Sequence, residues 1–207
     1  MLRVLHRRET AHLSKSARSG APGAVSLLRD VQGAALLEFA ISLPLLVVFV
    51  VGIFDFSGAF NQKQKIEQAA QEGAIVAGAQ PMSDIQSIAG SNPVSLQPVV
   101  TAILNSLVAS GVLPTGTCGP PTASGPTGLA WTYKVSGCSS GYPSDQLVIV
   151  INRGSVSGAG PAAVCTVVTV TYPYHWRFNS VIQLLIPGAN YASTTQVTES
   201  ATVHNQM

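Results

Sequence analysis

The stretch Gly33–Phe56, GAALLEFAISLPLLVVFVVGIFDF, decides how this chain is organised. Between its two acids, Glu38 and Asp55, it holds sixteen consecutive uncharged residues, Phe39–Phe54. A helix that crosses a bilayer needs about 20 apolar residues, so these sixteen are slightly too few. Adding Ala34–Leu37 gives 21 positions and draws Glu38 to the edge of the hydrocarbon. The stretch predicts one membrane-spanning helix with an acid near its start.

Two residues inside this stretch need a physical account. An ionised acid at the bilayer centre costs about 3 kcal/mol, and less near the interface, so Glu38 calls for a neutralising partner. Pro44 removes one backbone hydrogen bond and is expected to kink the helix. The Ser42 hydroxyl could help to satisfy the carbonyl that Pro44 frees.

Charge is distributed unevenly around the span, and this predicts the topology. Residues 1–33 carry six Lys and Arg against two acids, whereas residues 61–207 carry five against five. Basic flanks stay on the cytoplasmic side, so residues 1–33 are expected to form a basic cytoplasmic leader and everything after Asp55 to lie outside. The neutral exported region also lacks the basic surface that nucleic-acid binding requires.

The composition fits one span plus one modest domain, because 46% hydrophobic and 10% charged residues is too apolar for an ordinary soluble domain and too polar for several spans. An exported domain meets an oxidising compartment, where disulfides persist. Cys118 and Cys138 both lie in Gly/Pro/Ser-rich loops and are the favoured pair. Cys165 lies in an apolar strand pattern and is expected to be a buried thiol outside the bridge.

Three regions are expected: the leader 1–33, a transmembrane plus stem helix over 34–80, and an exported domain over 81–207. A continuous helix over 34–80 would be about 70 Å long. The stem places small and apolar residues on one face, which suits packing against a sheet or another helix. These residues are Ile66, Ala69, Ala70, Gly73, Val76 and Ala77.

Beyond the stem, a helix pattern with Pro98 in its first turn ends before Gly111 and Pro114. The segment 115–128, TGTCGPPTASGPTG, is a loop by composition. Segment 178–188 is a short helix or an apolar loop. Four strands are expected, at 129–136, 146–152, 163–174 and 192–203. Helices followed by strands, without β-α-β alternation, predict an α+β fold with a small antiparallel sheet.

Catalytic chemistry is poorly represented in the exported region. His175 lies among aromatic residues in YPYHWRF and is expected to be packed or at the solvent edge. His204 and Cys165 have no neighbours at metal-ligand spacing. The Gly-rich segment 154–160, GSVSGAG, follows no phosphate-binding or dinucleotide pattern and is expected to be a flexible loop. We therefore expect no enzyme activity, cofactor, metal or small-molecule substrate.

Read from Gly33, the sequence gives a glycine, four small or apolar residues, Glu38, the aromatic Phe39 and a long apolar run after a basic leader. This arrangement resembles the processing motif of type IV prepilins, and is most similar to the type IVb, Flp-like group. The stretch ALLEFAISLPLLVVFVVGIFDF, followed by a Gln/Ala-rich helix, resembles the TadE-like family of the tight-adherence (Tad) pilus system. The resemblance is specific over about residues 30–80, and the later strands suit the family's ending.

The resemblance implies a pilin-like fold and a bacterial inner-membrane protein with a periplasmic C-terminal domain. A prepilin peptidase would cut between Gly33 and Ala34, and Glu38 and Phe39 would direct packing with other pilins and Tad secretion platform proteins. The α-amino group of a cleaved Ala34, on the same or a neighbouring subunit, could neutralise Glu38. An exported domain larger than that of a small major Flp pilin implies a minor pilin or pseudopilin, with a TadG-type relative as another possibility. The 33-residue leader is long for a pilin, which could reflect a misassigned start codon.

Other interpretations of the N-terminal region stay open. An uncleaved signal anchor would make the protein a membrane-anchored periplasmic scaffolding or binding protein outside any filament. A secretory signal peptide ending at Ser57–Ala59 satisfies the small-residue rule but needs an unusually long basic region. A mitochondrial presequence explains the basic head but not the Gly33–Phe39 pattern.

Overall fold

A computed structural model describes residues 31–86, 92–116, 118–138, 142–157, 163–178, 183, 188 and 194–206. By its internal contacts the chain divides into two compact units, residues 1–46 and residues 47–207. Each unit is described by itself below. Residues 1–30 of the expected leader and most of segment 178–188 lie outside the described residues.

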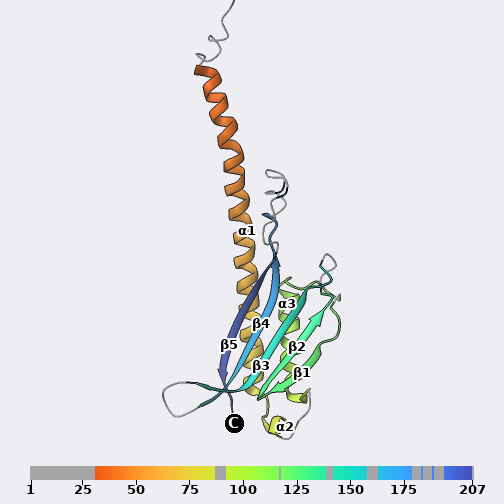
Figure 1. Cartoon of the computed structure of the whole chain (residues 1–207). Helices are drawn as coiled ribbons and strands as arrows, with labels where there is room; N and C mark the ends of the chain where they lie inside the picture. The colour runs from red at the N-terminus through yellow and green to blue at the C-terminus, as the bar shows by residue number, and fades with distance from the viewer. Residues whose placement is uncertain are drawn as a thin grey trace, which may run out of the picture. The chain divides into compact units, whose positions relative to one another are not determined.

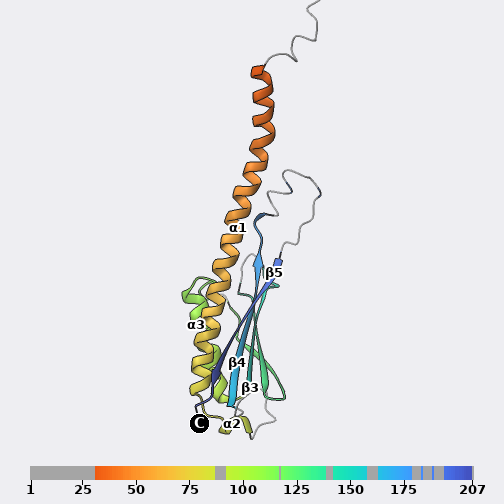
Figure 2. The same ribbon diagram turned by 90° about the vertical axis from the view of Figure 1, so that its left-hand side faces the viewer.

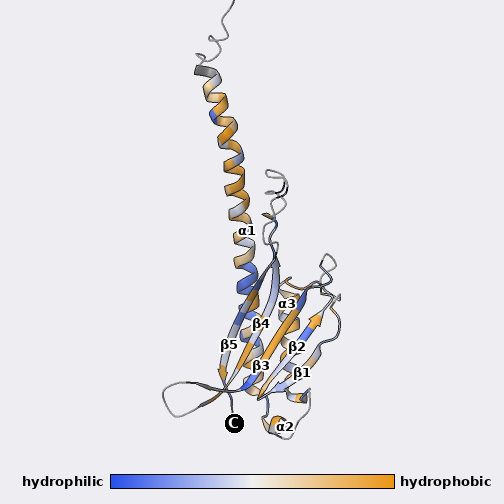
Figure 3. Cartoon of the chain, in the orientation of Figure 1, coloured by the Kyte–Doolittle hydropathy of each residue, from blue (hydrophilic) through white to orange (hydrophobic). Residues whose placement is uncertain are grey.

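Helix α1 (Val31–Ala79) is a single 49-residue helix that belongs to both units (Figure 1). Its first half is almost uniformly apolar, and polar residues gather in its second half (Figure 3). Pro44 lies inside the helix. The Ser42 hydroxyl donates a 2.6 Å hydrogen bond to the carbonyl of Glu38. The carbonyl that a proline frees is four residues earlier, that of Ala40, so the expected role of Ser42 is wrong.

After α1, the described residues form two further helices, a 3₁₀ turn and five strands that have defined bounds. In order they are α2 (Ser83–Gln86), η2 (Val94–Leu96), α3 (Gln97–Ala109), β1 (Thr122–Thr127), β2 (Ala130–Ser136), β3 (Gln146–Ser157), β4 (Ala163–His175) and β5 (Thr194–His204). Pro98 occupies the first turn of α3, where its missing N–H has no intrahelical partner to lose.

The strands form one antiparallel sheet in the order β1-β2-β3-β4-β5, so each strand pairs with its neighbours in sequence. Alternation along the strands gives the sheet one buried face: Trp131, Tyr133 and Val135 of β2 are buried, while Lys134 between them is exposed. Helix α3 and the C-terminal half of α1 cover that face (Figure 2). The result is a two-layer α+β arrangement, which confirms the predicted fold class.

The stem half of α1 contributes mainly small side chains to the core. The fully or almost fully buried ones are Ile66, Ala69, Ala70, Ala74 and Ala77. At Gly73 the helix comes so close to α3 that an added Cβ would lie 2.5 Å from Ile103 Cγ1. At Gly78 a Cβ would lie 2.9 Å from Val203 Cγ1 of β5. Small residues on this face therefore let the helix lie close to both α3 and the sheet.

The end of α1 is held by a buried arginine. Arg153 of β3 is 0% exposed and donates hydrogen bonds to the carbonyls of Ala77 (2.9 Å), Gln80 (2.7 Å) and Pro81 (3.1 Å). Carbonyls at a helix C-terminus lack intrahelical donors and carry partial negative charge, so a cation is favoured there. Burial lowers the pKa of Arg153, and the negative charge of Asp84 raises it in opposition.

Two loop predictions need correction. Residues 122–127, expected to be loop, form the edge strand β1. Its side chains are exposed or half-buried, so it lacks an apolar alternation, and an edge position tolerates its proline. Residues 154–157, expected to belong to a flexible loop, continue β3. The pairing register with β4 shifts between Asn152 and Ser155, so Gly154 lies at an irregularity in the strand.

Cys118 and Cys138 form a disulfide that joins the segment before β1 to the end of β2. Cys165 lies outside this bridge, is buried in β4, and has its sulfur 3.3 Å from His204 Nδ1. The domain boundaries expected at residues 33 and 80 remain predictions. The core nevertheless includes residues on both sides of residue 80, from Ile66 of α1 to Tyr172 of β4.

Candidate functional site

The N-terminal motif lies at the beginning of α1, in the first unit. Gly33 and Ala34 are in the first turns of the helix and are exposed. An added Cβ at Gly33 would meet nothing within 4 Å. Glu38 is exposed, and Phe39, the next residue, is 64% exposed. The described part of this unit thus presents the motif on an open helix.

The apolar half of α1 is suited to a lipid or a helical partner. It is the one described helix long and apolar enough to cross a membrane, and none of its most apolar window is buried. Large side chains such as Leu36 (73%), Ile41 (67%) and Ile53 (70%) are mostly exposed. A helix that is apolar all round and uncovered requires an apolar surrounding, which is consistent with a single membrane span.

In the second unit, Asp55 joins α1 to the end of the sheet. It is 5% exposed although it ends the apolar run. Its Oδ2 accepts a 2.7 Å hydrogen bond from the backbone N–H of Phe178. The Tyr174 hydroxyl lies 3.0 Å from both Asp55 Oδ1 and the Asp55 carbonyl. The carboxylate is therefore satisfied by the end of β4 and the residues that follow it.

Close packing reinforces this contact. A Cβ at Gly58, on the next turn of α1, would lie 2.7 Å from the Tyr174 hydroxyl. Gln62, one further turn along, donates a 3.2 Å hydrogen bond to the carbonyl of Pro173. Asp55, Gly58 and Gln62 therefore form one strip of the helix that contacts the end of β4, and these three residues are called the Asp55 strip below.

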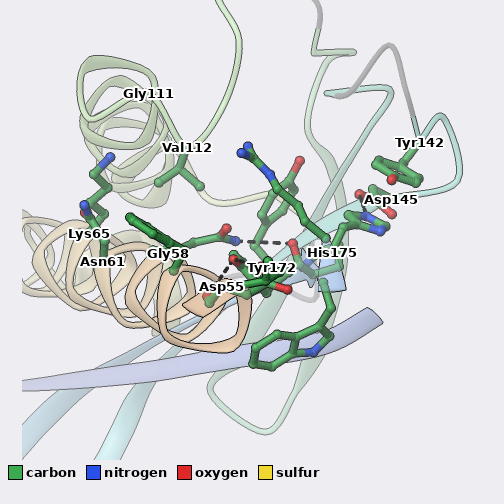
Figure 4. A pocket seen from close by; sticks show the side chains of 17 residues that line it. Asp55, Gly58, Asn61, Lys65, Gly111, Val112, Tyr142, Asp145, Tyr172 and His175 are labelled. Carbon is green, nitrogen blue, oxygen red and sulfur yellow. Dashed lines mark hydrogen bonds and ion pairs between the residues drawn. The ribbon is translucent and has the colours of Figure 1, made fainter. Parts of the chain in front are cut away.

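A cleft of about 770 Å³ opens beside the Asp55 strip (Figure 4). Lys65 and Asn61 enter it from α1, whereas Tyr142, Asp145 and His175 lie on the other side in this view. The cleft thus mixes acids, bases and aromatic rings. Such a lining does not select one charge of ligand.

The acid–imidazole pair in the cleft links two parts of the sheet. Asp145 Oδ2 lies 2.6 Å from His175 Nε2, and the Tyr142 ring stacks on the imidazole at 3.4 Å. Thr194 Oγ1 lies 3.3 Å from His175 Nδ1. Acid, imidazole and hydroxyl in series resemble a nucleophile relay, but both imidazole nitrogens face side chains of edge or loop segments. We interpret the group as a structural contact that joins the start of β3, the end of β4 and the start of β5.

Two tyrosines that line the cleft, Tyr172 and Tyr174, have raised pKa values. Burial raises the pKa of Tyr174, and the hydrogen bond and negative charge of Asp55 raise it further, against the opposing charge of Arg177. Burial and the negative charge of Asp145 raise the pKa of Tyr172. A protonated Tyr174 hydroxyl is what donation to Asp55 requires.

The structure adds residues that the sequence did not single out. Asp55 was expected only to end the span, and Arg153 was counted only as a scattered charge. Each has a faint signal: Asp55 stands alone among aromatic residues, and Arg153 follows the apolar strand QLVIVIN. His175 is half-buried and paired with Asp145. Among the described residues no group of three or more His, Cys, Asp or Glu could hold a metal ion.

Comparison with known proteins finds a match for the N-terminal part of the chain. No curated protein and no solved structure matches the chain significantly. Residues 33–74, about a fifth of the chain, match the model of the family described as TadE-like protein. Members of that family are generally non-catalytic components of pili, which suggests a protein associated with the Tad pilus. The match confirms the predicted resemblance: residues 33–74 of this chain are a TadE-like family domain.

Proposed function

We propose that the protein is a non-catalytic minor pilin or pseudopilin of a Tad-type pilus, which supports pilus assembly in adherence or secretion. The observation that carries the proposal is the TadE-like match over residues 33–74. The α+β fold, with an N-terminal apolar helix whose second half packs on an antiparallel sheet, agrees with it.

In this proposal the protein spans the bacterial inner membrane once, with residues 1–33 in the cytoplasm and the sheet in the periplasm. The excess of Lys and Arg before the span supports that orientation. A prepilin peptidase removes the leader between Gly33 and Ala34, which exposes a new α-amino group.

Glu38 then acts in assembly. It is exposed on α1, four residues after Ala34, and an unpaired carboxylate at the edge of the hydrocarbon is unfavourable. The α-amino group of Ala34 on a neighbouring pilin neutralises it, so pairing favours one helix register over others. Phe39 and the exposed apolar side chains after it supply the packing surface, and Pro44 sets the local bend.

The mature N-terminus tests the proposal directly. We expect mass spectrometry of the membrane protein to find Ala34 as the first residue. Gly33→Leu should leave the leader attached, whereas Gly52→Leu, on the same helix, should be processed normally. An intact leader on the wild-type protein would refute processing and favour an unprocessed, membrane-anchored scaffolding or binding protein.

The role of Glu38 has a matched control on the same helix. Glu38→Ala should permit export and processing but strongly reduce piliation. Glu67→Ala removes another exposed acid, from the stem, and should leave piliation unchanged. Normal piliation in Glu38→Ala would contradict the role of Glu38 in assembly. It would not affect the conclusion about cleavage before Ala34.

A further inference from the structure

Aromatic side chains surround α1 where its uncharged run ends. Phe54, Phe56 and Phe60 are 74%, 63% and 64% exposed. Trp176, from the segment after β4, packs edge-on against Phe56 with ring centroids 5.4 Å apart. Tyr174 packs edge-on against Trp176 at 5.1 Å. Residues from opposite layers of the second unit therefore meet in one aromatic cluster, defined here as Phe56, Tyr174 and Trp176.

The helix fixes the height of this cluster relative to a membrane. At 1.5 Å per residue, Phe56 lies about 3 Å and Phe60 about 9 Å beyond Phe54, the last residue of the uncharged run. The polar headgroup layer on each side of the hydrocarbon is about 5–8 Å thick. If the run ends at the hydrocarbon boundary, Phe56 and the Trp176 ring in contact with it lie within the headgroup layer.

The chemistry of the cluster suits that layer. Tryptophan and tyrosine concentrate at membrane–water interfaces because they combine an apolar ring with a polar group. Trp176 Nε1 donates a 2.6 Å hydrogen bond to Thr195 Oγ1, so the indole can contact lipid without leaving its N–H unpaired. Arg177, the next residue, is exposed and supplies a cation. The acid at the same height, Asp55, is buried and hydrogen-bonded inside the protein.

We propose that Trp176, together with Phe56, is an interfacial anchor that docks the exported domain on the headgroup layer of a phospholipid bilayer. The partner is the bilayer itself, because the cluster is continuous with the helix that enters it. The anchor is a second membrane contact beside the span and limits tilting of the exported domain relative to the bilayer surface. The inference rests on the proposed membrane span.

The chain carries its own control for a fluorescence test. Its second tryptophan, Trp131, is 0% exposed in the core. Trp131 pairs across the sheet with Ile151, and Ile151 with Val168 of β4. Val168 and Trp176 are eight residues apart, about 26 Å along an extended strand. A quencher in the upper bilayer can therefore reach Trp176 without reaching Trp131.

The experiment uses the full chain in vesicles of phosphatidylcholine and phosphatidylglycerol, with and without bromine on the upper acyl chains. Trp131→Phe leaves Trp176 as the emitter, and Trp176→Phe leaves Trp131. Brominated lipid should lower the emission of Trp131→Phe at least about twofold and leave that of Trp176→Phe nearly unchanged. If Trp131→Phe does not fold, subtracting the Trp176→Phe signal from that of the wild type gives the same quantity.

Extraction with alkaline carbonate tests the proposed membrane span separately from the proposed interfacial anchor. Carbonate-resistant protein with unquenched Trp176 would refute the anchor and leave the span intact. Equal quenching of both tryptophans would also overturn it, because the whole domain would then lie on lipid. Release by carbonate would refute the span, and the anchor with it.

Discussion

The side chain of Asp55 joins α1 to the end of the sheet through hydrogen bonds. It follows directly on an apolar run, but both its carboxylate oxygens accept hydrogen bonds from the far layer of the second unit. A hydrogen bond to a charged group contributes about 1.5–3 kcal/mol, and loss of one partner leaves the other group buried and unpaired. The end of the span is therefore joined to the sheet by the hydrogen bonds of Asp55 as well as by side-chain packing.

Asp55→Asn should lower the free energy of unfolding by about 2 kcal/mol. The substitution keeps the shape, but the amide loses the charge and cannot accept at both positions. Urea unfolding of the full chain in detergent measures the change. Glu67→Gln, on the exposed face of the same helix, should change stability by less than about 0.5 kcal/mol. Equal stabilities of Asp55→Asn and wild type would contradict the role of the Asp55 strip.

The raised pKa of Tyr133 predicts that the protein loses stability at alkaline pH. Burial raises its pKa to about 12, from 10.0. Because the folded pKa is the higher one, the unfolded chain loses this proton first as pH rises. The contribution is therefore complete below about pH 10 and disappears as pH rises toward 12. Tyr172 and Tyr174, whose pKa values are also raised, act in the same direction.

The check is the free energy of unfolding at a series of pH values in wild type and Tyr133→Phe. The variant loses the 2.9 Å hydrogen bond from the Tyr133 hydroxyl to Asn92 Oδ1 and should be about 1 kcal/mol less stable near neutral pH. Its stability should then fall less steeply than that of wild type above pH 10. Parallel curves would show that another group causes the alkaline loss.

At the scale of elements, the contact between α1 and α3 depends on Gly73. Gly73→Leu places a side chain where Ile103 already lies, and overpacking of this kind costs about 1–3 kcal/mol. Gly52→Leu is the matched control, because an added Cβ at Gly52 would meet nothing within 4 Å. Thermal unfolding in detergent should show a lower midpoint for Gly73→Leu alone. Similar midpoints for both variants would mean that α3 can move away without loss.

The disulfide between Cys118 and Cys138 ties the poorly packed edge strand β1 to the rest of the sheet. The two cysteines are 20 residues apart, and closing a loop of this size stabilises a fold by about 3 kcal/mol. Reduction with dithiothreitol should lower the unfolding midpoint of wild type. It should have no further effect on Cys118→Ala/Cys138→Ala, which starts from the lower value. A midpoint insensitive to reduction would show that β1 contributes little to stability.

At the scale of the whole molecule, the core contains the stem half of α1 as well as the strands. A fragment of residues 55–207 keeps Asp55 and the buried face of α1, and should fold with the disulfide formed. A fragment of residues 81–207 lacks Ile66–Ala77 and exposes the apolar face of the sheet, so it should aggregate or stay unfolded. Near-UV circular dichroism and gel filtration distinguish these outcomes. A well-folded 81–207 fragment would show that the stem is dispensable.

The sequence was most informative where a single period or motif dominates. The helix pattern before Gln80, the α3 pattern and four of the five strands could all be predicted from residue type and periodicity, and the TadE-like resemblance from the Gly33–Phe39 motif. The edge strand β1 could not, because an exposed strand held by backbone pairing and a disulfide needs no apolar alternation. The roles of Asp55 and Arg153 could not be predicted either, because their partners are distant in the sequence. The partners of Asp55 are 119 and 123 residues away, and those of Arg153 are 72 to 76 residues away.

The two polar contacts of α1 also determine how the molecule carries mechanical load. Asp55 stands at one end of the packed stretch of α1 and the carbonyl of Ala77, held by Arg153, at the other, about 33 Å apart along the helix. A pull along the helix axis acts on both ends together, and between them Ile103 projects into the gap that Gly73 leaves. The helix cannot slide past the sheet one contact at a time. Force on α1 is therefore resisted in shear by the whole interface, and this is the load that a membrane or a fibre pulling on the helix would impose.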